Sequence, residues 1–152
     1  MIIPFHSFQI YMPLVRAVPE ANNLSVRNLW SEFTELSVSI ILIDNYEELT
    51  KNLTESAIST LNAKLNECIT QWCERYHGLL RKLERNRFLF IFEKRDLKEA
   101  MDEKFSILED VHAITSPSGM AASISFGLGV EGETFEEGYR FASLAIEMAL
   151  SR

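Results

Sequence analysis

Two polar residues, Asp44 and Asn45, stand between an apolar run and a helical pattern, at a point where polar groups could bind a ligand. The run, residues 38–43, is β-branched and continuous, which predicts a strand covered on both faces. Asp44 or Asn45 would cap the following helix, whose unpaired N–H groups and positive dipole end attract phosphate. Capping is the preferred interpretation of Asp44. A cation-binding role is the weaker alternative, because the residue beside it at position 42 is a leucine and not a second carboxylate. The pattern indicates a nucleotide site.

A charged connection between two further apolar runs supplies the second half of this candidate site. Residues 79–83 and 88–92 predict short strands, and the four residues Glu84–Arg87 between them suit an antiparallel hairpin. The basic groups of Arg81, Lys82, Arg85 and Arg87 could hold phosphates in place of Mg²⁺, since guanidinium groups bind phosphates bidentately. A solvated turn without a ligand is the alternative.

Composition narrows the possible classes of protein. A chain of 152 residues with 47% hydrophobic residues suits one domain with a core and argues against disorder. The net charge of -7 would repel a phosphate backbone, so we expect no nucleic-acid partner. Cys68 and Cys73 match no zinc spacing and are interpreted as reduced core thiols, and the three histidines are isolated from one another. With no signal peptide and no apolar run of about 20 residues, we expect a cytoplasmic location.

The remaining patterns predict an α/β (α+β) fold. Residues 1–36 are interpreted as a linker or the remnant of a preceding domain, ending in a short helix from Ser25. After the strand at 38–43 come a long helix that stops near Gly78, the hairpin, and a helix from a capping box at Asp96 to about Ile114. A strand over 121–126 follows, its end loosened by glycines, and then a last helix capped by Thr134. This order is the ferredoxin-like βαββαβ arrangement with a mixed, mainly antiparallel sheet flanked by helices.

These elements, in this order, resemble the GGDEF domains, the nucleotidyl cyclase-like catalytic domains of diguanylate cyclases. In active members the first strand reads Asp-x-Asp-x-Phe-Lys-x-Ile-Asn, in which the first Asp binds Mg²⁺ and the Asn contacts guanine. Here Leu42 takes the position of that Asp and Thr50 that of the Asn, while the signature falls on Glu84–Phe88 and keeps only its Phe. Phosphoryl transfer needs carboxylates to hold Mg²⁺, so the resemblance implies a domain that is not a diguanylate cyclase.

With these departures from the active sequence, the chain resembles the degenerate GGDEF domain of cyclic-di-AMP phosphodiesterases of the GdpP/YybT type. The shared stretches are Ile43–Thr50, the Glu84–Phe88 hairpin, Lys104–Leu108 and Leu144–Arg152. Such proteins join two membrane helices, a PAS sensor, this domain and a DHH/DHHA1 phosphodiesterase, so the resemblance implies a regulatory domain on the cytoplasmic side of a membrane-anchored bacterial protein. It also implies adenine nucleotide, with ATP and Mg²⁺ as possible ligands, and at most weak ATPase activity.

Two hypotheses follow. The first is a regulatory domain that binds adenine nucleotide, and the second is a structural dimerisation or linker module, a possible homodimer, without nucleotide affinity. Neither assigns a catalytic residue. Combining the residue patterns with the resemblance gives one candidate nucleotide-binding set, which is Asp44, Asn45, Thr50, Glu84, Arg85, Asn86 and Arg87, with Asp44 as the weak metal candidate.

Overall fold

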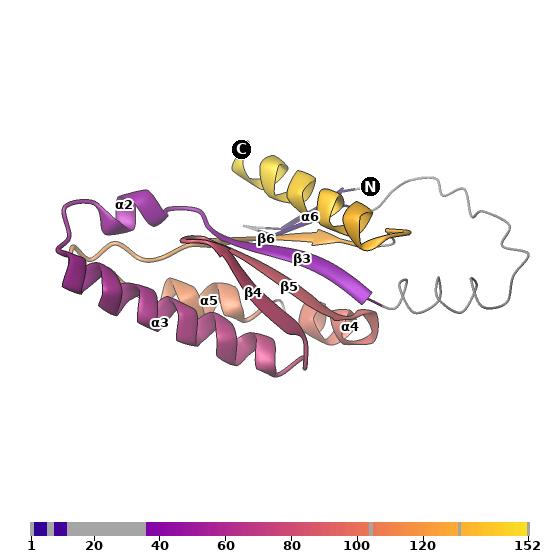
Figure 1. Ribbon diagram of the computed structural model, residues 1–152, viewed down its shortest axis with the longest axis horizontal. Helices are drawn as coiled ribbons and strands as arrows, with labels where there is room; N and C mark the ends of the chain where they lie inside the picture. Colours follow the sequence, from indigo (N-terminus) through magenta and orange to yellow (C-terminus); the bar gives the residue numbers. More distant parts are fainter. Residues whose placement is uncertain (1, 6–7, 12–35, 104, 131, 152) are drawn as a thin grey trace, which may run out of the picture.

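The computed structural model describes residues 2–5, 8–11, 36–103, 105–130 and 132–151. Its elements form one six-stranded sheet with helices on both faces (Figure 1). In chain order they are β1 (Ile2–Phe5), β2 (Phe8–Tyr11), β3 (Leu36–Ile43), α2 (Tyr46–Thr50), α3 (Glu55–Glu74), β4 (Leu79–Glu84), β5 (Arg87–Glu93), α4 (Lys94–Asp102), α5 (Ile107–His112), β6 (Ile124–Gly129) and α6 (Phe135–Leu150).

The ferredoxin-like core is confirmed. The sheet order is β1-β2-β6-β3-β5-β4, and the last four strands pair antiparallel, as the βαββαβ order requires. A parallel pairing of β2 with β6 makes the sheet mixed. The strands β1 and β2 were not expected from the sequence, and the interpretation of residues 1–36 as a linker or remnant stays a prediction. The short helix predicted there lies outside the described residues, except that Leu36 begins β3.

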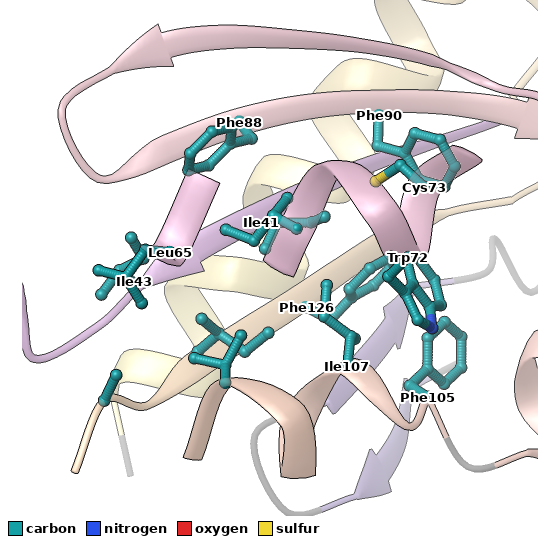
Figure 2. Packing of buried hydrophobic residues seen from close by; sticks show 14 of the residues in the cluster. Ile41, Ile43, Leu65, Trp72, Cys73, Phe88, Phe90, Phe105, Ile107 and Phe126 are labelled. Carbon is teal, nitrogen blue, oxygen red and sulfur yellow. The ribbon is translucent and has the colours of Figure 1, made fainter. Parts of the chain in front are cut away.

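The main core lies between the sheet and the helices α3, α4 and α5. Side chains alternate along β3, so Ile41 and Ile43 enter this core while Ile40 and Leu42 face α6 on the other side. Trp72 of α3 stands at the centre, with ring centroids 5.8 Å from Phe90 and 5.7 Å from Phe126 in edge-on contacts (Figure 2). The burial of both faces explains why the β3 run is apolar throughout.

The prediction of one continuous helix from Asp96 to about Ile114 is wrong. The structure has two helices, α4 and α5, and α4 begins after Glu93, so the capping box at Asp96 does not form. Phe105 lies between them with φ of 50°, in the left-handed region, and its side chain is buried at 3% exposure. Tertiary packing of this aromatic ring overrides the helical pattern.

Close approach of α6 to β6 depends on two glycines. A Cβ on Gly129 would lie 2.1 Å from the Gly138 carbonyl oxygen, and one on Gly127 would lie 2.4 Å from the Ala142 carbonyl oxygen. Both glycines belong to β6, which runs three residues beyond the predicted strand end at Phe126, so the prediction that they loosen its end is wrong. Because neither glycine has a side chain, α6 can pack directly against the sheet.

The last helix begins as predicted, with Thr134 accepting a hydrogen bond from the Glu137 N–H at 3.1 Å. The helix expected directly after Asn45 is instead divided into α2 and α3, and Thr54 caps α3 by accepting from the Ala57 N–H at 3.2 Å. At the end of α3 the left-handed residue is His77, with φ of 51°, whereas Gly78 is required for space because a Cβ there would lie 2.4 Å from the Phe90 ring. Both cysteines are free thiols, and burial raises the pKa of each. Within the described ranges, no helix combines the length and apolar character needed to cross a membrane.

Candidate functional site

Three segments meet at the end of β3 where the candidate residues lie. The Ile43 N–H donates to the Asn86 carbonyl oxygen at 2.8 Å, and the Asn86 side-chain amide donates back to the Ile43 carbonyl oxygen at 3.4 Å. On the other side, the Asp44 N–H donates to the Ser123 carbonyl oxygen at 3.1 Å. The β3–α2 connection is therefore fixed between the hairpin turn and the segment that enters β6.

The Asp44 carboxylate is held by two serine hydroxyls. Ser123 Oγ donates to Asp44 Oδ1, and Ser125 Oγ donates to Asp44 Oδ2 at 2.7 Å. Each carboxylate oxygen thus accepts a hydrogen bond from a different serine. We call this arrangement the serine clamp, formed by Asp44, Ser123 and Ser125.

Helix capping by Asp44 or Asn45 is therefore a wrong prediction. Asn45 occupies the position before α2 but makes no side-chain cap bond. Its amide instead donates to the Ala121 carbonyl oxygen at 2.9 Å and its Oδ1 accepts from the Ser123 N–H at 3.0 Å. Because α2 has five residues, its dipole is too small to support phosphate binding at its start. Tertiary partners from the β6 segment outcompete the local cap.

Thr50 lies at the end of α2 with its hydroxyl engaged by the helix itself. Its Oγ1 donates to the Tyr46 carbonyl oxygen at 2.9 Å. The hydroxyl retains its acceptor capacity, but its proton is used within the helix. Thr50 is thus on the same short helix as the site and contributes no donor to it in this conformation.

The hairpin turn is shorter than predicted. Glu84 ends β4 and Arg87 begins β5, so only Arg85 and Asn86 form the connection. A register shift between Lys82 and Glu84 accommodates the remaining residue as a bulge. The prediction of a four-residue turn is wrong because strand pairing extends into the charged residues at both ends.

The two arginines differ in their surroundings. Arg85 is 79% exposed in its side chain, and its guanidinium lies 3.8 Å from a Glu47 carboxylate oxygen, a solvent-screened pair of little energetic weight. Arg87 is half-buried, and its Nε is shielded from solvent with no hydrogen-bond partner among the described residues. In the strand register Arg87 lies directly opposite Glu84 of β4, so a carboxylate-bearing residue is its cross-strand neighbour.

Leu42 separates the basic and the acidic parts of the site. It pairs with Arg87 on one neighbouring strand and with Ser125 on the other, so these three side chains lie in one row on the α6 face. Leu42 is 8% exposed and packs with Ala142 and Ile146 of α6. A carboxylate in this position would lie opposite Arg87, whereas leucine provides an apolar floor.

Sequence reasoning missed Ser123 and Ser125. The only available signal is their alternation with apolar residues before and within β6, which places both on one face of the strand. The described residues contain no group of three or more histidine, cysteine, aspartate or glutamate side chains placed to hold a metal ion. Asp44 is thus a single carboxylate, and each of its two oxygens accepts one serine hydrogen bond.

A second polar cluster lies at the far end of α3. Glu103 accepts hydrogen bonds from Trp72 Nε1 at 2.9 Å and from the Tyr76 hydroxyl, and it also lies 3.7 Å from Arg75. Burial, and then the bond to Glu103, raise the pKa of Tyr76. Arg75 makes another 3.7 Å ion pair, to Asp110 of α5. This cluster fastens α3 to the α4–α5 connection and is separate from the serine clamp.

The chain has the fold of GGDEF domains. It is similar to the structure of a sensory box/GGDEF family protein from Caulobacter crescentus CB15, with a TM-score of 0.65, 16% identity, and coverage of 84% of this chain and 85% of that one. It also resembles the active GGEEF domain of a diguanylate cyclase from Vibrio cholerae, with a TM-score of 0.62, 14% identity, and coverage of 80% and 87%. At these identities the likeness establishes the fold.

Sequence comparison gives the particular family. The family described as cyclic-di-AMP phosphodiesterase GdpP-like, GGDEF domain, matches residues 41–152, and the chain belongs to it. The cyclic-di-AMP phosphodiesterase GdpP of Bacillus subtilis is 30% identical over 115 residues, which are 76% of this chain and 18% of that protein. The cyclic-di-AMP phosphodiesterase PdeA of Listeria monocytogenes is 25% identical over 75% of this chain and 17% of its own length. The chain therefore spans less than a fifth of the relatives it matches.

Proposed function

We propose that this chain is a regulatory GGDEF domain, degenerate in catalysis, that binds adenine nucleotide and belongs to a membrane-anchored cyclic-di-AMP phosphodiesterase. Its partners there are the PAS and DHH/DHHA1 domains of the parent protein. At most a weak ATPase activity accompanies the binding. The family assignment and the relatives' names support the parent activity, and the site supports the ligand.

The observation that supports the proposal most strongly is that the side chains around Leu42 differ in charge from those of a cyclase. A cyclase holds Mg²⁺ against its triphosphate with carboxylates from two strands. Here the row across the sheet presents Glu84, Arg87, Leu42 and Ser125, so its exposed carboxylate stands opposite a guanidinium. A site in which a leucine takes the position of a metal-binding carboxylate suits binding of phosphates better than their transfer between two nucleotides.

Calorimetric titration of the folded chain with ATP tests this function. Replacing both Arg85 and Arg87 by Ala should cost about 1–3 kcal/mol in binding, because hydrogen bonds to charged groups lie in this range. Replacing Arg95 and Lys98 of α4 by Ala instead makes the same change in net charge at two exposed positions on another element and should leave the affinity nearly unchanged. Absence of ATP binding at millimolar concentration would contradict the proposal.

A second candidate, a structural dimerisation module, is favoured by the half of the sheet that no described helix covers on the α6 side. The helix α6 lies over β6 and β3, while β4 at the sheet edge has all but one residue exposed (Figure 1). Leu79 on this strand is 66% exposed. Sedimentation would support this candidate if the chain were a dimer that Leu79→Glu converts to a monomer, and would count against it if the chain were monomeric at all concentrations.

A further inference from the structure

The α6 side of the sheet carries an apolar strip that no described helix covers. The helix α6 packs mainly on β6, β3 and β2, whereas β5 and β4 lie beyond it. Val38 of β3 faces α6, because a Cβ on Gly138 would lie 3.0 Å from its Cγ2. Across the sheet Val38 stands in register with Ile91 and then with Leu79, so these side chains share the α6 side. Leu79 is 66% exposed, and the outer half of this row is therefore open to solvent.

A groove continues this strip to the start of α6. Its sheet side is lined by Leu36, Val38 and Ile91, and its helix side by Phe135 and Gly138. Leu36 is 42% exposed and Phe135 is 44% exposed. Large apolar side chains gathered on one open face mark a place where another element packs.

The dimensions of the uncovered strip suit one short α-helix. Neighbouring strands lie about 4.8 Å apart, so β5 and β4 together span about 10 Å, which is the diameter of a helix with its side chains. Along β3 and β5, three successive rows face α6, namely Val38 with Ile91, Ile40 with Leu89, and Leu42 with Arg87. The first and third rows are about 14 Å apart at about 3.4 Å per residue, the length of a helix of about nine residues.

The chain leaves and re-enters the described structure beside this groove. Tyr11 ends β2 and pairs with Gly129 of β6, and Gly129 pairs on its other side with Val38. Tyr11 and Val38 therefore lie about 10 Å apart at one end of the sheet. Residues 12–35, which lie outside the described residues, connect β2 to β3, and the next residue, Leu36, lines the groove. Because this segment is tethered at the groove, its effective concentration there exceeds that of a separate molecule.

The sequence of this segment has the pattern that the strip requires. Apolar residues recur at i, i+3, i+4 and i+7, which predicts an amphipathic helix with one apolar stripe made of Val26, Leu29, Trp30 and Phe33. The residues between them are polar or charged, namely Arg27, Asn28, Ser31 and Glu32. Residues 25–33 have the length of the strip, and two residues remain for the turn into β3.

We propose that residues 25–33 form a helix that docks through this apolar stripe on β5 and β4, alongside α6, with Phe33 nearest the groove at Leu36. The start of the helix then lies toward the row of Leu42 and Arg87, so the segment connects the groove with the candidate nucleotide site. The inference does not depend on nucleotide binding. A second copy of the chain is the competing occupant of this face.

Acrylamide quenching of tryptophan fluorescence in the whole chain tests the docking. The chain has two tryptophans, and Trp72 is 1% exposed in the core on the other face of the sheet, so a change in quenching reports Trp30. The quenching constant should be at least threefold lower in the chain than in a synthetic peptide of residues 25–35. Leu79→Glu should raise it at least twofold, because a charge on the strip opposes burial of the apolar stripe. The control Leu150→Glu, at a residue that is 52% exposed near the end of α6, should leave it unchanged.

Urea unfolding of the whole chain gives an independent readout. Trp30→Ala and Leu79→Ala together should lose less stability than the sum of the two single losses, because both side chains belong to one packed interface. Trp30→Ala combined with Leu150→Ala should be additive. Additive losses for Trp30 and Leu79, or a quenching constant in the chain equal to that of the peptide, would overturn the proposal.

Dilution distinguishes docking within one chain from a second copy. Docking within the chain predicts shielding of Trp30 that does not change on dilution. Shielding that is lost on dilution, with sedimentation showing a dimer that Leu79→Glu dissociates, would assign the face to a second copy and overturn the proposal. If circular dichroism shows that Leu79→Glu is unfolded, Leu79→Ser serves instead, and unchanged quenching in that variant would equally refute the docking.

Discussion

Replacement of Leu42 tests the structural basis of the site through stability and binding together. Leu42 is 8% exposed and packs against Ala142 and Ile146. Because it lies at the end of a small cluster, Leu42→Ala should fall in the lower half of the roughly 2–5 kcal/mol range for buried leucines. For a chain of this length, this loss lowers the melting temperature by about 5–10 °C.

Leu42→Asp should be less stable still, because it also places a charge beneath α6. The new carboxylate would lie opposite Arg87, pair with it and repel phosphate, so ATP affinity should fall well below that of Leu42→Ala. Urea unfolding and ATP titration of the two variants measure both effects. A Leu42→Ala stability within 0.5 kcal/mol of the parent chain would refute the packing argument. Equal ATP affinity in the two variants would refute the electrostatic one.

Three further predictions follow from the described contacts. The chain should make no cyclic-di-GMP from GTP with Mg²⁺ or Mn²⁺, since Leu42 and Asn86 cannot replace the metal-binding carboxylates; product above a no-enzyme control would contradict this. It should not hydrolyse cyclic-di-AMP alone, because the described residues hold no cluster suited to two metal ions, and hydrolysis by a metal-loaded, contaminant-free sample would be the opposing result. Glu103→Ala should cost about 2–4 kcal/mol by leaving Trp72 and Tyr76 without their acceptor, while the exposed Asp102→Ala should cost little; equal losses in urea unfolding would disprove the role of Glu103.

The fold could be predicted because its signals are local and strong. The run that became β3, the apolar stripe of α3 and the cap at Thr134 each agree with the final structure. Together with their order along the chain, they specify the ferredoxin-like core. The family resemblance, confirmed by the match over residues 41–152, rested on the order of these elements and on short stretches such as Ile43–Thr50 and Glu84–Phe88.

The errors arose where distant partners outweighed local preference. Asp44 and Asn45 have the chemistry of helix caps, but their side chains bind residues 76 to 81 positions away along the chain. The break between α4 and α5 likewise depends on where Phe105 is buried. Such contacts leave no periodic trace in the sequence, so the serine clamp and the left-handed residue could be found only in three dimensions.

Hydrogen exchange with saturating ATP tests the central claim most directly, since it reports where the nucleotide binds. The account predicts slower exchange of backbone amides in residues 42–46, 85–88 and 121–126, the three segments joined around Asp44, with α5 unchanged. No change in these segments, or protection confined to the groove between α3 and α5 that Lys64, Gln71 and Arg75 line, would contradict it.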